Sequence, residues 1–180
     1  MPQNTERYIE AEVFKDEVAS PRRFALAYAD KNSILNRGTI MSYDNQNIFA
    51  KILREELPCI KVYEDEHTLA FMDIMPQSEG HTLVIPKVAA ETLFELPASH
   101  YEACFNTLKK VGNALKKAFG TEGIMMFQLS GADAGQTVPH LHFHLLPTSI
   151  HTLRTSTHAA KMADQVILQG YADRIIAVME

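Results

Sequence analysis

Apolar and polar positions follow regular spacings from residue 47 onward, and these spacings predict a series of short elements. A short helix is expected to begin after Asn47, whose side chain suits an N-cap, and to stop before Pro58. Strands are predicted where apolar and β-branched residues gather between turn-forming residues. The expected strands cover residues 60–64, 68–74, 80–86, 123–129 and 138–147.

One long helix is predicted at residues 97–119, because its apolar side chains recur at steps of three and four residues. Gly120 directly follows it and suits the left-handed conformation that ends many helices. The connections between neighbouring elements are mostly short. Five strands around one long helix therefore predict an α+β fold with an antiparallel sheet.

A second helical pattern covers residues 158–180 and predicts a C-terminal helical extension within residues 151–180. Its apolar side chains form a broad stripe of Met162, Val166, Ile167, Tyr171, Ile175, Val178 and Met179. Such a stripe either packs on the protein's own sheet or forms an interface with a partner. Packing on the sheet is the arrangement expected here, because broad stripes more often face a core.

The first 42 residues lack a sustained period, apart from a weak helical pattern at residues 8–14. Met41 lies just before the first strongly patterned segment and would serve as an initiator. Two interpretations stay open: residues 1–42 form a loosely packed or disordered arm, or they are an artefact of an upstream start. The domain that holds the core is expected at residues 43–150.

Composition limits the classes of protein that fit. Hydrophobic residues make up 46% of the 180-residue chain, enough for one filled core and hardly enough for two. The net charge of −5 argues against a nucleic-acid groove. Cys59 and Cys104 form no paired motif, which argues against a disulfide framework and excludes a thiol-rich zinc knuckle. No apolar run approaches the roughly 18 residues of a membrane span, and no secretory segment is evident, so a cytoplasmic protein is expected.

Three histidines alternate with apolar residues in the segment VPHLHFHLLP. On a strand, His140, His142 and His144 would share one face at spacings of about 6.6 Å, with the intervening residues facing the core. Such imidazoles could bind a metal ion, with His81, His100 or a carboxylate completing the site, or could act as nucleophile and acid. The alternative without function is a row of partly exposed histidines on a solvated face. Alternation after a glycine loop favours function, but spacing alone leaves metal binding and covalent catalysis nearly tied.

The segment HLHFHLL at 140–146 resembles the signature of the histidine triad (HIT) superfamily of nucleotide hydrolases and transferases. Four more segments resemble that family in the same order: NIFAK at 47–51, FMDIMPQ at 71–77, HTLVIPK at 81–87 and AGQTV at 134–138. The resemblance implies the HIT-like fold, a five-stranded antiparallel sheet with a long central helix. It also implies a homodimer in which the sheets of two copies join into one of ten strands.

The resemblance assigns roles to the histidines. His142 corresponds to the nucleophile that attacks the α-phosphorus, giving a nucleotidyl-histidine intermediate that water hydrolyses. His144 corresponds to the histidine that contacts the phosphate and, when protonated, assists the leaving group, and His140 to the one that orients the site. His81 and Gln136 correspond to residues near the phosphate, although a strand-capping His81 and a Gln136 that bonds its own loop are the plainer alternatives.

The same motifs imply nucleotide contacts. Asp73 corresponds to the acid that accepts hydrogen bonds from the ribose hydroxyls, with a turn-forming role as the alternative. Thr137 corresponds to a phosphate or leaving-group contact. Ser130 lies near the position where relatives often carry an asparagine, so that a contact there is lost or taken over by Ser130. The base would lie in an apolar slot whose members could equally be ordinary core: Phe49, Ile52, Phe71 and Ile74.

Together these residues predict a cofactor-free enzyme that hydrolyses nucleoside phosphoramidates or related nucleotidyl conjugates, with a purine nucleotide as the expected substrate part. The paired cysteines of the structural zinc site of some relatives are missing, so no bound metal is expected. Dinucleoside polyphosphate hydrolysis and a nucleotide-binding regulatory module with weak turnover are the alternatives. The residues after Pro147 depart from the family pattern and leave the leaving group and the base preference open.

Overall fold

The computed structural model describes residues 43–155 and 161–180. The expectations for residues 1–42, including the helical pattern at 8–14, lie outside the described residues. The strands are β1 (Lys61–Glu64), β2 (Thr68–Met72), β3 (Thr82–Pro86), β4 (Met125–Gln128) and β5 (Phe143–Leu146). The helices are α2 (Ile48–Leu53), α3 (Tyr101–Phe119), α4 (Ile150–Thr155) and α5 (Gln165–Ile176), with 3-10 turns η1 (Leu93–Glu95), η2 (Ala98–His100) and η3 (Ala132–Ala134).

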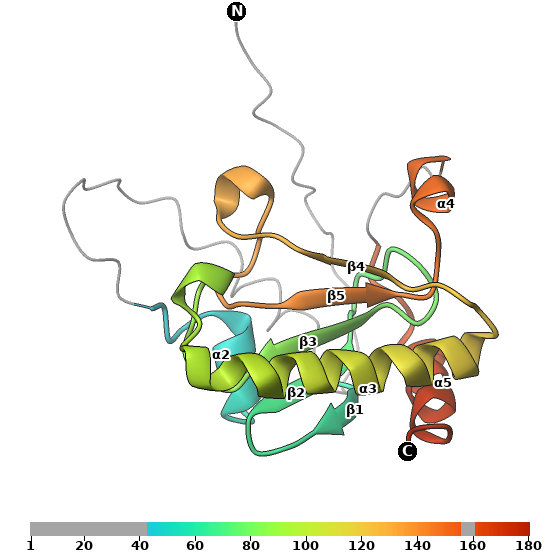
Figure 1. Ribbon diagram of the computed structural model, residues 1–180, viewed down its shortest axis with the longest axis horizontal. Coiled ribbons are helices and arrows are strands. Elements are labelled where there is room, and N and C mark those ends of the chain that lie inside the picture. Colours follow the sequence, from blue (N-terminus) through green and yellow to red (C-terminus); the bar gives the residue numbers. More distant parts are fainter. Residues whose placement is uncertain (1–42, 156–160) are drawn as a thin grey trace, which may run out of the picture. The chain divides into compact units, whose positions relative to one another are not determined.

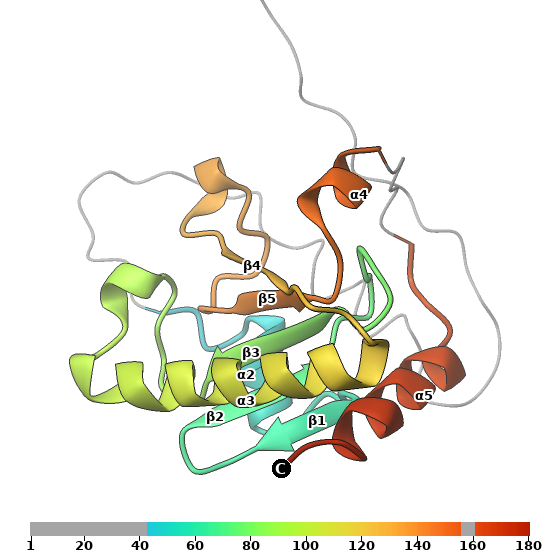
Figure 2. The ribbon, with the colours of Figure 1, turned by 45° about the vertical axis from the view of Figure 1, so that its right-hand side comes forward.

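The five strands form one sheet in the order β1-β2-β3-β5-β4, and all neighbouring strands are antiparallel. β5 lies between β3 and β4, so β1 and β4 are the edges (Figure 1). The long helix α3 lies along one face of this sheet (Figure 2). The α+β fold with a five-stranded antiparallel sheet and a long central helix is therefore confirmed.

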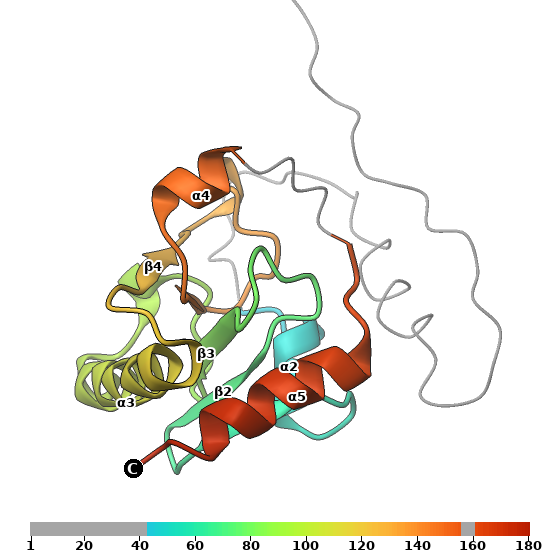
Figure 3. The same ribbon diagram turned by 90° about the vertical axis from the view of Figure 1, so that its right-hand side faces the viewer.

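The main core lies between α3 and the sheet. Cys104, Leu108, Val111 and Leu115 recur on the buried face of α3, as the helical spacing predicts. Gly120 ends the helix with a φ of 62°, a left-handed conformation that costs glycine no steric strain. The short helix α2 lies on the opposite side of the sheet from α3 (Figure 3). The two faces of the sheet are thus covered by different elements.

Asn47 caps α2 and links it to the histidine segment. Its Oδ1 accepts a hydrogen bond of 2.8 Å from the N–H of Ala50, which confirms the predicted N-cap. Its Nδ2 donates to the carbonyls of Asp44 at 2.7 Å and Pro139 at 3.3 Å. The start of α2 is therefore tied to the residue that precedes the first histidine of the triad.

The C-terminal region differs in part from the prediction. The helix α5 begins at Gln165 rather than at residue 158, because Asp164 caps it by accepting from the N–H of Val166 at 2.7 Å. Residues 158–160 lie outside the described residues. The helix packs on the protein's own core, as expected, through Ile175 of the predicted stripe and through Leu168 and Ala172, which the stripe did not include. Three more residues of the stripe pack against this core while partly exposed: Tyr171, Val178 and Met179. The prediction of burial was wrong for three residues of the stripe, which are exposed: Met162, Val166 and Ile167.

Three further observations concern the helices and the cysteines. α4 follows Pro147 and was not predicted. Cys59 and Cys104 are both free thiols. None of the helices in residues 43–155 and 161–180 has the length and apolar character needed to cross a membrane.

Candidate active site

The histidine segment is only partly a strand, which corrects the prediction of three imidazoles on one regular strand face. Pairing with the neighbouring strands begins only after His142. Pro139 has no N–H to offer a strand, and the N–H of Leu141 donates instead to the carbonyl of Ala90 at 2.7 Å. The bend leaves His140 before the sheet. The intervening residues do face the core, as predicted: Leu141, Phe143 and Leu145.

Hydrogen bonds to the backbone fix the protons of two histidines. Nδ1 of His142 lies 2.7 Å from the carbonyl oxygen of His140, and because a carbonyl can only accept, Nδ1 carries the hydrogen. Nε2 of His142 therefore keeps its lone pair. His140 donates from Nε2 to the carbonyl of Pro86 at 2.9 Å, and its Nδ1 accepts from the hydroxyl of Tyr43. Each ring is held as one neutral tautomer.

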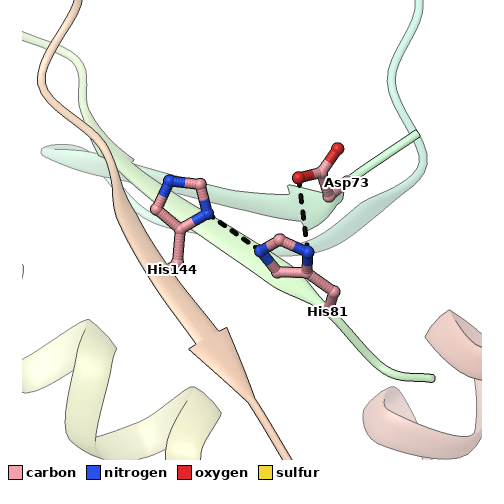
Figure 4. A group of neighbouring side chains, drawn as sticks. All are labelled: Asp73, His81 and His144. Atoms are coloured by element: carbon pink, nitrogen blue, oxygen red, sulfur yellow. Dashed lines mark hydrogen bonds and ion pairs between the residues drawn. The ribbon is translucent and has the colours of Figure 1, made fainter. Parts of the chain in front are cut away.

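A chain of contacts orients His144 through His81 (Figure 4). The backbone N–H of Gln77 donates to Nδ1 of His81 at 3.1 Å, which leaves the hydrogen of this ring on Nε2. His81 then donates from Nε2 to Nδ1 of His144 at 2.9 Å. His144 consequently carries its own hydrogen on Nε2. At the other end of the chain, Oδ2 of Asp73 lies 3.4 Å from Nδ1 of His81.

Burial keeps all four rings neutral near pH 7. Removal from water lowers the pKa of His140 to about 4 and the pKa of His144 to about 3. The rings of His142 and His81 lower the pKa of His144 further, because each would repel its positive charge. Burial also lowers the pKa of His142 and of His81, against the opposing charge of Asp73. The protein without substrate therefore holds His144 as a neutral donor, whereas the resemblance implied its protonated form.

Two ring nitrogens remain available to a substrate. Neither Nε2 of His142 nor Nε2 of His144 has a hydrogen-bond partner within the described part of the chain. Among the described residues, every fully buried side-chain nitrogen and oxygen has a hydrogen-bond partner. Because these two nitrogens have none, they are not fully buried and reach the solvent. The centres of the two rings lie 5.0 Å apart. The lone pair on His142 can attack an electrophile, and the hydrogen on His144 can assist the leaving group.

The polar residues of the glycine loop that were predicted to contact the nucleotide bond the loop and the segments beside it. Gln136 accepts from the N–H of Gly131 at 2.6 Å and donates to two backbone carbonyls at 2.7 and 2.9 Å. Ser130 donates to Gln128 at 2.8 Å. Thr137 is exposed at the surface. The bond to Gly131 matches the plainer alternative given for Gln136, whereas the bond to Glu91 ties the loop to a distant segment. Substrate contacts by these residues stay predictions.

The predicted base pocket adjoins the triad through Phe49. Its ring meets the ring of His142 edge-on, with centres 5.2 Å apart, and meets the ring of Phe71 at 5.4 Å. Ile52 is buried on the inner side of α2, and Ile74 is partly exposed just after β2. The four side chains are thus not equivalent. Ile74 lies at the edge of the pocket, and the other three are core residues: Phe49, Ile52 and Phe71.

The described residues contain one group of three side chains that could hold a metal ion, namely Asp73, His81 and His144, with ligand atoms within 4.8 Å of one another. His81 turns one nitrogen toward Asp73 and the other toward His144 (Figure 4). A single ion needs ligands about 2.0 to 2.2 Å away that converge on it, so these side chains would have to rearrange. Asp73 also has the alternative turn role, because its Oδ1 accepts from the N–H of Met75 at 2.8 Å.

Two residues next to the triad were not found from the sequence. Tyr43 bonds His140 from 97 positions away along the chain. Phe127 stacks on His144, with ring centres 4.3 Å apart and planes 12° from parallel. Strand periodicity assigns Phe127 to one face of its own strand, but the register that places it opposite His144 is not visible in the sequence.

Comparison with known proteins finds relatives of this architecture. A model of the HIT domain matches residues 54–151. The adenylylsulfatase HINT3 of Arabidopsis thaliana is 41% identical over 103 residues, which are 57% of this chain and 52% of that protein. The adenosine 5'-monophosphoramidase hnt1 of Schizosaccharomyces pombe is 43% identical over 100 residues, which are 56% of this chain and 72% of that protein. The matched part thus spans about half the length of the plant relative.

A solved structure is similar over a larger share of the chain. The Hit-like protein involved in cell-cycle regulation from Bartonella henselae has a TM-score of 0.68 and 40% identity. The match covers 77% of this chain and 100% of that one. All four histidines of the site lie within the residues that the domain model matches, whereas Tyr43 and Phe49 precede them.

Proposed function

Because the chain belongs to the HIT family, we propose that it hydrolyses purine nucleoside phosphoramidates or related nucleotidyl conjugates through a covalent intermediate on His142. The observation that carries the proposal is the pair of accessible nitrogens, a lone pair on Nε2 of His142 beside a hydrogen on Nε2 of His144. Relatives named as a phosphoramidase and an adenylylsulfatase support the substrate class.

In the first step, Nε2 of His142 attacks the α-phosphorus, and the bond from phosphorus to the leaving amine breaks. Positive charge develops on the ring of His142. The carbonyl of His140, which accepts from Nδ1, stabilises that charge more in the transition state than before the attack. The negative phosphate favours the charged form of His144, whose pKa rises from its low value in the free protein. A proton taken up on Nδ1 of His81, beside Asp73, lets the Nε2 hydrogen of His81 pass to Nδ1 of His144. Nε2 of His144 then gives its own hydrogen to the amine and keeps a lone pair.

In the second step, water attacks the phosphorus of the intermediate. His144, now neutral, accepts a proton from that water as the bond between phosphorus and Nε2 of His142 breaks. His142 returns to the neutral tautomer with its hydrogen on Nδ1, and a nucleoside monophosphate leaves. Splitting one displacement into two lets the same pair of rings serve both halves of the reaction.

The nucleoside part would lie between the apolar slot around Phe49 and the carboxylate of Asp73. Asp73 is connected to the phosphate side of the site through the chain that runs by His81 to His144 (Figure 4). A carboxylate can accept from both ribose hydroxyls at once. The sugar and the reacting phosphorus would therefore bind at adjacent parts of one surface.

A homodimer is part of the proposal. The edge strand β4 and the helix face beside it expose large apolar side chains, with Phe105 53% and Met126 51% exposed. Phe105 contacts Phe143 of β5, and Met126 lies opposite Leu145, so both are on the side of the sheet that faces α3. Pairing of β4 with its copy would cover these side chains and extend the sheet. Sedimentation equilibrium is expected to give twice the chain mass, and a monomer at micromolar concentration would contradict it.

A panel of substrates tests the proposed activity. The protein is expected to release AMP from adenosine phosphoramidate and from adenylyl sulfate faster than from diadenosine polyphosphates. Faster cleavage of the dinucleotides would instead establish the polyphosphate hydrolase. Binding of AMP in calorimetry without turnover of any of these compounds would reject the enzyme and leave the binding module.

A further inference from the structure

Phe127 makes the one flat contact among the ring contacts that His144 has in the described structure. The planes of Phe127 and His144 differ by 12°, with centres 4.3 Å apart. The rings of His81 and His142 meet His144 at 37° and 64°, with centres 5.1 and 5.0 Å away. Phe127 therefore covers a face of the imidazole, whereas the neighbouring histidines approach it at an angle.

The sheet register places this contact. Phe127 of β4 and His144 of β5 are direct partners in the antiparallel ladder, so their side chains project from the same face of the sheet. β4 is the edge strand, and Phe127 is partly buried there. Its ring covers the face of the imidazole that is turned toward β4.

One hydrogen bond alone would not fix the plane of His144. The bond from His81 restrains Nδ1, but a hydrogen bond tolerates a range of angles, so the ring could still rock about its own Cβ–Cγ bond. Flat stacking on an aromatic face removes this freedom, because turning the imidazole would break the contact. The hydrogen bond and the stack together determine where Nε2 and its hydrogen point.

We propose that Phe127 is a positioning residue that holds the plane of His144 so that its Nε2 faces the phosphorus and the leaving group. The inference rests on the proposed function for its consequence in catalysis. Phe127 touches no reacting atom and acts through His144. The same ring excludes water from one face of the imidazole and so contributes to the burial that disfavours its charged form.

Two substitutions separate stacking from bulk. Phe127→Leu keeps an apolar side chain but loses the flat ring, and it is expected to lower kcat about tenfold with little change in KM, because orientation rather than binding is lost. Phe127→Tyr keeps the ring and is expected to retain kcat. Met125→Leu is the matched control, since Met125 lies on the same strand and face but opposite Leu146. Equal kcat in the leucine and wild-type proteins would overturn the inference.

The pH profile and an NMR titration provide readouts that a loss of stability would not mimic. His81, His142 and Asp73 lie around His144 in both proteins, so any change on Phe127→Leu reports the lost ring. We expect the titration of the His144 ring protons to move to higher pH, and with it the alkaline limb of kcat, because the first step needs His144 protonated. In wild type, those protons should show the upfield shift that a stacked ring causes.

The outcomes distinguish this inference from the function on which it rests. Wild-type turnover with no upfield shift, or with no change in titration on Phe127→Leu, would overturn the role of Phe127 and leave the enzyme standing. If wild type turns over no nucleotide conjugate, the proposed function fails. The ring shift then still tests the contact, since it needs neither a substrate nor a variant that folds.

Discussion

Turnover of an adenosine phosphoramidate is expected to fall by on the order of 10³-fold or more when His142 is replaced by alanine, because the lone pair on Nε2 of His142 beside the donor of His144 is lost. Loss of the nucleophile removes the covalent step entirely. The rate of AMP release under saturating substrate measures the effect.

Two controls interpret that result. His67→Ala removes an exposed histidine from the turn between β1 and β2 and should leave turnover unchanged. AMP binding to the His142→Ala protein should persist, since the apolar slot and Asp73 remain. A His142→Ala protein that turns over at the wild-type rate would exclude His142 as the nucleophile.

Acidification is expected to destabilise the fold strongly. The pKa values of His140 and His144 are lowered to about 4 and about 3, so an unfolded chain, in which a histidine titrates at about 6.5, binds more protons than the native state between those limits. The unfolding free energy is therefore highest above about pH 6.5, and it decreases as the pH falls toward the pKa values of the native state. At pH 5 these two rings together account for about 4 kcal/mol of lost unfolding free energy.

Urea unfolding at pH 7 and pH 5 measures this difference. His144→Asn removes one of these rings and is expected to make the loss of unfolding free energy smaller by about 2 kcal/mol, because one ring fewer then gains a proton on unfolding. Equal unfolding free energies of the wild-type protein at the two pH values would show that the buried histidines are not held neutral.

Local patterns in the sequence determined most of the fold. The helix that ends at Gly120 and the N-cap at Asn47 depend on neighbouring residues alone, and both were predicted with their physical roles. The strands also lie where they were expected, apart from shorter ends. The resemblance to the family predicted that His81 lies near the triad, which no local pattern could indicate, and His81 does bond His144.

Contacts between distant segments explain what was not predicted. The bend before β5 depends on the carbonyl of Ala90, which accepts the N–H that a longer strand would have used. The stack of Phe127 depends on the register between two strands. α5 is apolar on more than one side, so spacing alone could not distinguish the buried Leu168 from the exposed Val166. Each of these features follows from tertiary packing.

Mass spectrometry of a quenched single turnover detects the covalent intermediate on His142 itself. The protein is mixed with a stoichiometric adenosine phosphoramidate, stopped within the first turnover, digested and searched for a modified peptide. We expect one nucleotidyl group on the peptide that contains His142, lost again as AMP is released and absent from His142→Ala. AMP release without any adduct, or with an adduct on another residue, would contradict it.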